Sequence, residues 1–254
     1  MRTISCLLKT VFYLVLAIPQ RRRIQRLLAQ GDEAAARPLI KQKVEEWSTA
    51  MLRFAGVTVD VYGQENRPSG PVLYAPNHQS NWDIMLSLAH LEQCGILSKE
   101  EIGKIPLIRH WMDFLHVEYI NRKDPRQFVK ALKLCEGHLT DHESFIIFPE
   151  GTRSKGEDLS ELKPGALRIA AKHGIPIIPV SIDGSYKIME ANGGRIRPGH
   201  VIITIQPQIP TEGMDKAAMK TLSETVRQSI LEGRETGRRL YSEQLKKNSE
   251  ATQA

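Results

Sequence analysis

Apolar and polar residues follow one another along the chain in patterns that predict short strands separated by longer helices. Residues 57–62 alternate with a period of two, which is typical of a half-exposed strand. Residues 125–139 repeat their apolar side chains at helical spacing, which predicts an amphipathic helix. The other predicted strands are 71–75, 117–122, 145–148 and 201–205, and the other predicted helices are 84–89, 166–173 and 215–233. Strands that alternate with helices predict an α/β fold with a mixed, largely parallel sheet flanked by helices.

Glycine and proline residues mark the predicted ends of these elements. Residues 20–55 read as mostly helical, with a break near Gly31 and an end at Gly56. Two prolines, Pro176 and Pro179, interrupt the apolar run 175–182. Because proline has no backbone N–H to donate to a ladder, we do not expect a regular central strand there. The polar tail from Lys246 is expected to fray.

The most apolar run is residues 4–18, but its uninterrupted part, 11–18, has only eight residues. A membrane-spanning helix needs about 20. A signal peptide would fit by length, but no small-x-small cleavage site follows. We expect a retained helical anchor that lies on the membrane or inserts partly, the alternative being a helix that packs on the protein's own core. The predicted divisions are an anchoring segment 1–55, an α/β domain 56–245 and a polar tail 246–254.

The charge distribution supports a membrane surface as a partner. The net charge is +6, and residues 1–60 hold ten Lys/Arg against five Asp/Glu, so that +5 of it lies beside the apolar run. Basic charge next to an apolar segment favours an anionic membrane over nucleic acid, and we expect no nucleic acid partner. The three cysteines, Cys6, Cys94 and Cys135, are isolated, which argues against a disulfide framework or a zinc site.

Residues 77–83 join the strand 71–75 to the helix 84–89 and contain a histidine and a carboxylate. His78 and Asp83 are five positions apart, so within one helix they would point about 140° away from each other. They meet only if the chain turns between them and Asp83 lies near the helix N-terminus. A carboxylate on one imidazole nitrogen fixes the tautomer and leaves the other nitrogen as a general base. The alternative is a helix cap beside a structural histidine.

A second polar motif, residues 149–154, also follows directly after a strand, where open α/β sheets bind ligands. Gly151 allows a ligand to approach the backbone closely. Arg153 offers a planar fork that suits phosphate. The alternative for Arg153 is a salt bridge within the loop. For Arg122, at the end of the strand 117–122, the alternative is a solvated charge.

Four motifs together resemble the PlsC-type glycerolipid acyltransferases in order and spacing. They are Asn77-His78-x4-Asp83, Tyr119-Ile120-Asn121-Arg122, residues 148–154 and residues 175–180. The resemblance covers about residues 40–210. In one departure, Arg109 stands where the family often has glycine after an Ile-Pro-Leu segment. The resemblance therefore does not predict the shape of the site entrance at that segment.

The resemblance implies transfer of a fatty acyl group from acyl-CoA or acyl-carrier protein to the hydroxyl of 1-acyl-glycerol 3-phosphate. The product would be phosphatidic acid, an intermediate of phospholipid biosynthesis. In this family His78 would be the general base and Asp83 would orient it. The acceptor would be held by Glu150, Gly151, Thr152 and Arg153, with Arg122 and Lys104 as further phosphate ligands. The resemblance implies no metal ion and no cofactor beyond the acyl donor.

Since both lipids stay in the bilayer, we expect the protein at the cytoplasmic face of the inner (plasma) membrane. Another lysolipid acceptor is an alternative within the same class. A metal-dependent phosphohydrolase would explain the arginines, but it needs at least three convergent ligands, and only His78 and Asp83 are obvious. A non-catalytic lipid-binding protein of the same fold is a third alternative. A serine esterase is disfavoured, because the chain has no Gly-x-Ser-x-Gly motif.

Overall fold

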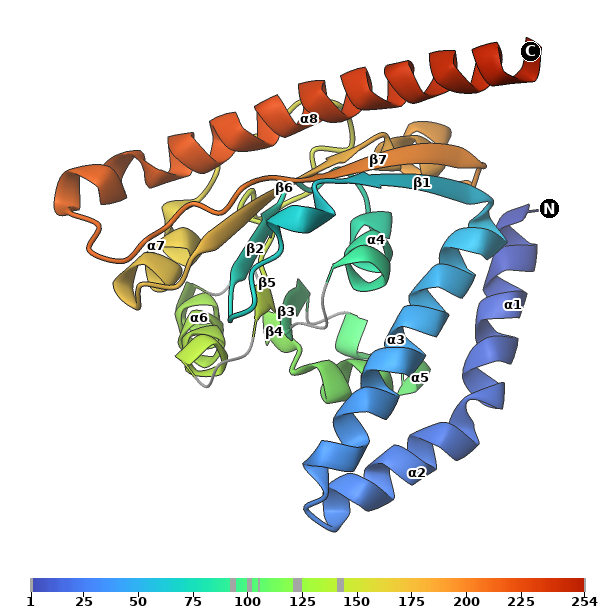
Figure 1. Cartoon of the computed structure of the whole chain (residues 1–254). Coiled ribbons are helices and arrows are strands. Elements are labelled where there is room, and N and C mark those ends of the chain that lie inside the picture. The colour runs from blue at the N-terminus through green and yellow to red at the C-terminus, as the bar shows by residue number, and fades with distance from the viewer. Residues whose placement is uncertain are drawn as a thin grey trace.

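The computed structural model describes the chain except residues 1, 92–94, 100–101, 105, 121–124, 141–143 and 254. Within the described residues, seven strands form one sheet in the order β1-β7-β6-β2-β5-β3-β4 (Figure 1). The strands are β1 (Val57–Tyr62), β2 (Leu73–Pro76), β3 (Gly95–Lys99), β4 (Glu118–Ile120), β5 (Phe145–Ile146), β6 (Ile177–Asp183) and β7 (Gly199–Ile205). Neighbours are parallel except β6 and β7, which are antiparallel. The predicted mixed, largely parallel sheet is confirmed.

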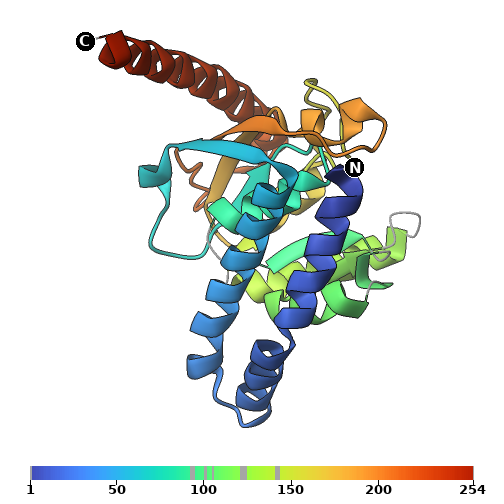
Figure 2. The same ribbon diagram turned by 90° about the vertical axis from the view of Figure 1, so that its right-hand side faces the viewer.

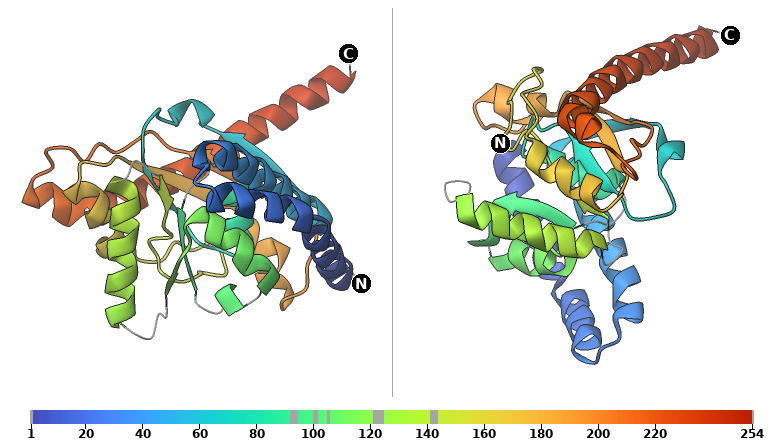
Figure 3. Two further views of the ribbon diagram at one scale, coloured as in Figure 1. Left: turned by 90° about the horizontal axis from the view of Figure 1, so that it is seen from below. Right: turned by 90° about the vertical axis from the view of Figure 1, so that its left-hand side faces the viewer.

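Helices cover both faces of the sheet (Figures 1 and 3). On one face lie α1 (Arg2–Leu16), α2 (Ile18–Ala29), α3 (Glu33–Ala55), α4 (Trp82–His90) and α5 (Pro106–Met112). On the other face lie α6 (Pro125–Thr140), α7 (Pro164–Lys172) and α8 (Lys216–Gln253). Adjacent residues of β2 show the two layers, because Tyr74 packs in the cluster under α3 and α4 while Leu73 packs under α6 to α8. Successive side chains of a strand point to opposite faces, so a doubly covered strand reads as a continuous apolar run.

Helix α1 lies alongside α3 (Figure 2) and uses one of its faces for this contact. Cys6 and Leu14 are buried in the same hydrophobic cluster as the inner face of α3. The guanidinium of Arg2 donates to the carbonyl oxygen of Ala55 at 3.2 Å. Gly56 ends α3 in the left-handed conformation, with φ 78°, as the sequence predicts. The hydrophobic core is thus continuous across residue 55, and the predicted domain division at that residue stays a prediction.

The opposite face of α1 is apolar but exposed. Its exposed large side chains are Ile4, Leu7, Leu8, Val11, Phe12, Val15 and Leu16. No described helix by itself has the length and apolar composition to cross a bilayer. Helices α1 and α2 meet those two requirements only as a pair, and they are bent by 46° at the break between them.

Two sequence predictions about secondary structure are wrong. The run 175–182 contains a regular central strand, β6, with Pro179 inside it. Pairing with the antiparallel neighbour β7 begins only at Val180, and the carbonyl of Pro179 still accepts from the Gln206 N–H at 3.0 Å, so the missing N–H interrupts no ladder. The tail from Lys246 continues α8 as far as Gln253, and this end projects beyond the rest of the molecule (Figures 2 and 3). Its Glu, Gln, Lys and Ala residues are strong helix formers.

Candidate active site

Three loops meet at the carboxyl edge of the sheet, because β6, β2 and β5 are neighbouring parallel strands. His78 and Asp83 follow β2, residues 149–154 follow β5, and Glu190 follows β6. Ligands of open α/β sheets bind at this edge. Hydrogen bonds between side chains and backbone join the three loops, so that residues far apart in the sequence form one polar site.

The side chains of His78 and Asp83 meet as the sequence predicts. Nδ1 of His78 lies 2.8 Å from Oδ2 of Asp83, and the two residues are only 6% and 0% exposed. Ser80 closes the turn between them, since its backbone N–H donates to the same Oδ2 at 2.7 Å. Its hydroxyl accepts from the N–H of Trp82 at the start of α4, at 3.1 Å. Asp83 therefore lies in the first turn of α4, where the helix dipole stabilises negative charge.

This arrangement determines which nitrogen of His78 can act as a base. A carboxylate accepts a hydrogen bond from Nδ1–H, so the proton stays on Nδ1 and the lone pair lies on Nε2. In the part of the chain that the structure describes, no protein group hydrogen-bonds to Nε2. The imidazole also stacks on the ring of Phe148, with 4.2 Å between ring centroids. The ring is thus held in place by one hydrogen bond and one stacking contact, with Nε2 directed away from the carboxylate.

Glu150 holds the backbone of His78. Its Oε1 accepts from the His78 N–H at 2.6 Å, and its Oε2 accepts from the Ser160 N–H at 3.0 Å. The N–H of Ser154 donates to the carbonyl oxygen of His78 at 2.8 Å. Burial raises the pKa of Glu150, although these backbone donors offset part of the effect. Since both carboxylate oxygens already accept a backbone N–H, the contacts of Glu150 favour positioning of the loops over direct contact with a ligand.

Arg153 is paired with a carboxylate that no sequence motif indicates. Its Nη1 lies 2.9 Å from Oε1 of Glu190. The same Oε1 accepts from the Asn81 N–H at 3.0 Å, and Oε2 accepts from the Ser80 hydroxyl at 2.5 Å. Arg153 therefore does form a salt bridge, but not within its own loop, which was the alternative that the sequence left open. Its partner comes from the loop after β6, and it also touches the turn that carries the catalytic candidates.

Two amide side chains, which sequence reasoning assigned no role, fix the start of the same loop. Asn77 continues the pairing of β2 with β6 through its side chain, accepting from the Ile182 N–H at 2.7 Å and donating to the Ile182 carbonyl at 2.9 Å. Gln79 accepts from the Gly184 N–H at 3.0 Å. Gln79 is fully buried. Amides directly after a strand were the available signal, because such groups replace backbone pairing where a ladder ends.

The remaining predicted site residues lie in different places. Gly151 has a φ of 69°. A Cβ at this position would lie 3.0 Å from Nζ of Lys163. Lys163 is therefore a second cation, besides Arg153, that lies close to this loop. Thr152 is exposed beside it. Lys104 is exposed on the 3-10 helix 102–104, which follows β3, two strands from β2. Arg122 lies outside the described residues.

An apolar cavity of about 210 Å³ borders α4 on the side of the N-terminal helices. Its wall includes Trp82 and Ile84, the neighbours of Asp83 in the sequence, together with Trp47 of α3 and Trp111 of α5. Thr10 of α1 completes the wall on that side. A cavity of this character accommodates hydrocarbon and not a charged group.

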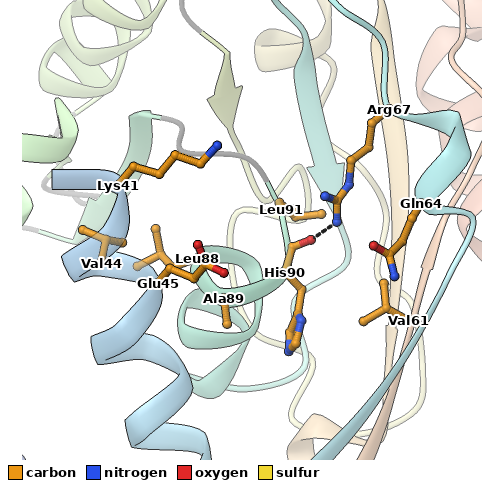
Figure 4. A pocket seen from close by; sticks show the side chains of 10 residues that line it. All are labelled: Lys41, Val44, Glu45, Val61, Gln64, Arg67, Leu88, Ala89, His90 and Leu91. Carbon is orange, nitrogen blue, oxygen red and sulfur yellow. Dashed lines mark hydrogen bonds between the residues drawn. The ribbon is translucent and has the colours of Figure 1, made fainter. Parts of the chain in front are cut away.

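A polar pocket of about 380 Å³ lies at the other end of α4, between that helix, α3 and the segment after β1 (Figure 4). Arg67 donates from Nη2 to the carbonyl oxygen of His90 (Figure 4), so this arginine stabilises the C-terminus of α4. Burial lowers the pKa of His90, and the nearby charge of Arg67 adds to that effect. None of the predicted site residues line this pocket. The Arg67–His90 contact in it has a structural role, which is to stabilise the end of α4.

Comparison with known proteins agrees with the geometry. A family model described as Acyltransferase matches residues 58–183. The chloroplastic 1-acyl-sn-glycerol-3-phosphate acyltransferase of Brassica napus is 39% identical over 153 residues, which are 59% of this chain and 44% of that protein. The 1-acyl-sn-glycerol-3-phosphate acyltransferase of Saccharomyces cerevisiae is 29% identical over 202 residues, 76% of this chain and 67% of that protein. The chain spans less than half the length of this Brassica napus protein, 44%, and of a chloroplastic 1-acyl-sn-glycerol-3-phosphate acyltransferase of Arabidopsis thaliana, 43%.

A solved structure extends the similarity to nearly the whole chain. The crystal structure of the 1-acyl-sn-glycerophosphate (LPA) acyltransferase PlsC from Thermotoga maritima matches with a TM-score of 0.76 and 28% identity. The match covers 93% of this chain and 98% of that chain. The matched fold, the family model over the loops after β2 and β5, and the buried histidine–carboxylate pair lead to one conclusion: the chain belongs to the PlsC-type acyltransferase family.

Proposed function

We propose that the protein is a 1-acyl-sn-glycerol-3-phosphate acyltransferase, which forms phosphatidic acid from a lysophosphatidic acid acceptor and acyl-CoA or acyl-carrier protein. The observation that carries this proposal is the buried His78–Asp83 pair, which adjacent strand-end loops bring close to Arg153. Acyl transfer to a phosphate-bearing lipid needs a base for the hydroxyl and a cation for the phosphate. These residues supply both.

In the proposed reaction, Nε2 of His78 takes the proton of the acceptor hydroxyl while that oxygen attacks the carbonyl carbon of the thioester. The C–S bond then breaks, and the departing thiolate receives the proton from the imidazolium. Asp83 stabilises that imidazolium through the bond between Oδ2 and Nδ1. The thioester is already an activated acyl group, so the proposal requires no covalent intermediate, no metal ion and no cofactor.

The acceptor phosphate is proposed to bind at the loop 149–154. Nη1 of Arg153 is used by Glu190, while its Nε and Nη2 make no hydrogen bond to any described residue. These two nitrogens form one edge of the guanidinium, which suits two phosphate oxygens. Gly151 and Thr152 are proposed to supply backbone contacts to the phosphate, and Lys163, which lies close to Gly151, adds positive charge. Direct phosphate contacts from Arg122 and Lys104 stay predictions from the family resemblance.

The lipid tails are proposed to use two apolar features, the cavity lined by Trp82 and Ile84 and the exposed face of α1. An acyl chain fits the chemistry of the 210 Å³ cavity beside Asp83. The exposed apolar face of α1 is proposed to lie in the membrane interface, where each side chain that leaves water contributes about 1.5–3 kcal/mol. Four arginines of α2, Arg21, Arg22, Arg23 and Arg26, would face anionic headgroups. The cytoplasmic face of the inner (plasma) membrane is the proposed location.

The test is mass spectrometry of the lipid products that the purified protein forms from acyl-CoA and a panel of lysolipids in EDTA. Phosphatidic acid formed from 1-acyl-glycerol 3-phosphate, and lost in His78→Ala, is the expected result. Product from a different lysolipid alone would change the acceptor. Release of inorganic phosphate would identify a phosphohydrolase instead, and lipid binding without any product would identify a binding protein.

A further inference from the structure

Glu190 is a nearly buried carboxylate outside every motif that the family resemblance rests on. It begins the 3-10 helix Glu190–Asn192, after β6, and only 5% of its side chain is exposed. Its two oxygens take part in three hydrogen bonds, with Arg153 Nη1 at 2.9 Å, the Asn81 N–H at 3.0 Å and the Ser80 hydroxyl at 2.5 Å. A buried carboxylate with this many charged and polar partners is fixed in position.

The first of these contacts determines how Arg153 presents itself. An arginine side chain carries about 2 kcal/mol of rotamer entropy, which binding must otherwise remove. By holding Nη1, Glu190 fixes the guanidinium plane before an anion arrives and leaves the edge formed by Nε and Nη2 for it. This pre-organisation lowers the entropic cost of binding.

The other two contacts connect Arg153 to the catalytic pair. Ser80 donates its hydroxyl to Glu190 and its backbone N–H to Oδ2 of Asp83. One carboxylate therefore spans the loop that would hold the acceptor and the turn that positions the base. The distance between the acceptor phosphate and Nε2 of His78 depends on this connection, and geometric errors of about 1 Å are costly in enzymes.

We propose that Glu190 is a positioning residue that holds Arg153 in register with the His78–Asp83 pair for the phosphate monoester of the acceptor. This inference rests on the proposed function for its substrate. The negative charge of Glu190 itself opposes an incoming phosphate, whereas its hydrogen bonds help to bind it. Glutamine keeps most of the bonds and removes the charge, while alanine removes both, so the two variants separate geometry from charge.

The experiment uses the full chain in detergent and measures binding of glycerol 3-phosphate by calorimetry and transfer kinetics with acceptor and donor varied separately. Glu190→Ala should weaken glycerol 3-phosphate binding and raise the acceptor KM, each about tenfold, with an unchanged donor KM. Glu190→Gln should stay within about threefold of the wild type in both. Glu224→Ala on α8, which removes an exposed carboxylate 3.7 Å from Arg227, is the matched control.

A double-mutant cycle identifies Arg153 as the partner. In an Arg153→Ala background, Glu190→Ala should have no further effect on glycerol 3-phosphate binding or acceptor KM. Additive effects, or a Glu190→Ala variant equal to the wild type, would overturn the inference. If Glu190→Ala lowers Tm so far that the variant is unfolded, Glu190→Gln provides the test. An acceptor KM and a donor KM raised equally in Glu190→Gln would also overturn the inference. Wild-type protein that binds glycerol 3-phosphate through both residues but forms no product would contradict the proposed function and not this inference.

Discussion

Asp83→Asn separates a catalytic pair from a helix cap, the two interpretations that the sequence leaves open. Asparagine has almost the same size, and its Oδ1 can still accept the Ser80 N–H. The fold should therefore survive the change. The variant loses the negative charge that lies 2.8 Å from Nδ1 of His78, and it no longer enforces the tautomer that leaves Nε2 as a base.

The structure gives the expected size of the effect. Two unit charges about 4 Å apart attract by about 4 kcal/mol at an effective dielectric constant of about 20. Asp83 is fully buried, so solvent does not reduce this attraction to its value in water. Since about 1.4 kcal/mol corresponds to a tenfold change in rate, kcat should fall roughly 1,000-fold. The interaction forms fully only when the imidazole is protonated, so KM should change much less than kcat.

The assay is steady-state transfer at saturating donor and acceptor, with Tm measured on the same samples. Asp215→Asn is the matched control, because Asp215 also accepts a backbone N–H, from Ala218 at 2.7 Å, but lies at the start of α8. It should keep wild-type kcat. A loss below about tenfold in Asp83→Asn, with Tm unchanged, would mean that the carboxylate only caps the helix and that the general-base mechanism is wrong.

His78→Ala should abolish nearly all turnover while calorimetric binding of glycerol 3-phosphate persists; more than a few per cent residual activity would contradict the assignment of the base. Arg153→Lys keeps the charge but loses the planar fork, so acceptor KM should rise about tenfold and donor KM should not. Leu8→Ser with Phe12→Ser alters only the exposed face of α1, so the variant should stay folded but leave vesicles in high salt, as flotation would show. Burial raises the pKa of Glu150 above 4.5, so the folded state retains a proton that the unfolded state has lost. In denaturant titrations, the free energy of unfolding of the wild type relative to Glu150→Gln should therefore fall as pH rises from 4.5 through the raised value.

Elements with strong local patterns could be predicted from the sequence. The strand 57–62 has the predicted bounds, and the predicted helix 125–139 is α6, one residue longer. The turn that brings His78 to Asp83 was also predictable, because residues five apart cannot meet within one regular helix. In each of these cases the deciding information lies within a few residues of the element. The same holds for Gly56, whose position after an amphipathic helix indicates the left-handed end that the structure contains.

Contacts between distant segments decided the rest. The missing N–H of Pro179 argues against a strand, but whether a ladder needs that N–H depends on where β7 ends, at Ile205. Glu190 lies 37 positions from Arg153 and 109 from Asn81, and nothing local distinguishes it from an ordinary loop carboxylate. The burial of Gln79 likewise depends on a distant segment, the loop after β6, whose Gly184 N–H donates to its side chain. The hydrophobic pattern of a single strand or helix does not say which strand ends become neighbours in the sheet.

Helix α1 lies between the proposed membrane interface and the proposed acyl-chain cavity. Leu8 and Phe12 are exposed on one side of it, while Thr10 lines the cavity from the other. A helix with its side chains is only about 10–12 Å across. If the exposed face lies in the bilayer, the cavity beside Asp83 is within about one helix diameter of the hydrocarbon. An acyl chain would then pass from the membrane to the dyad with little exposure to water, which matters because each methylene that enters water costs about 0.8 kcal/mol. The position of α1 against α3 would therefore serve the proposed chemistry as well as the proposed membrane attachment, and substitutions that tilt α1 away from α3 should impair both.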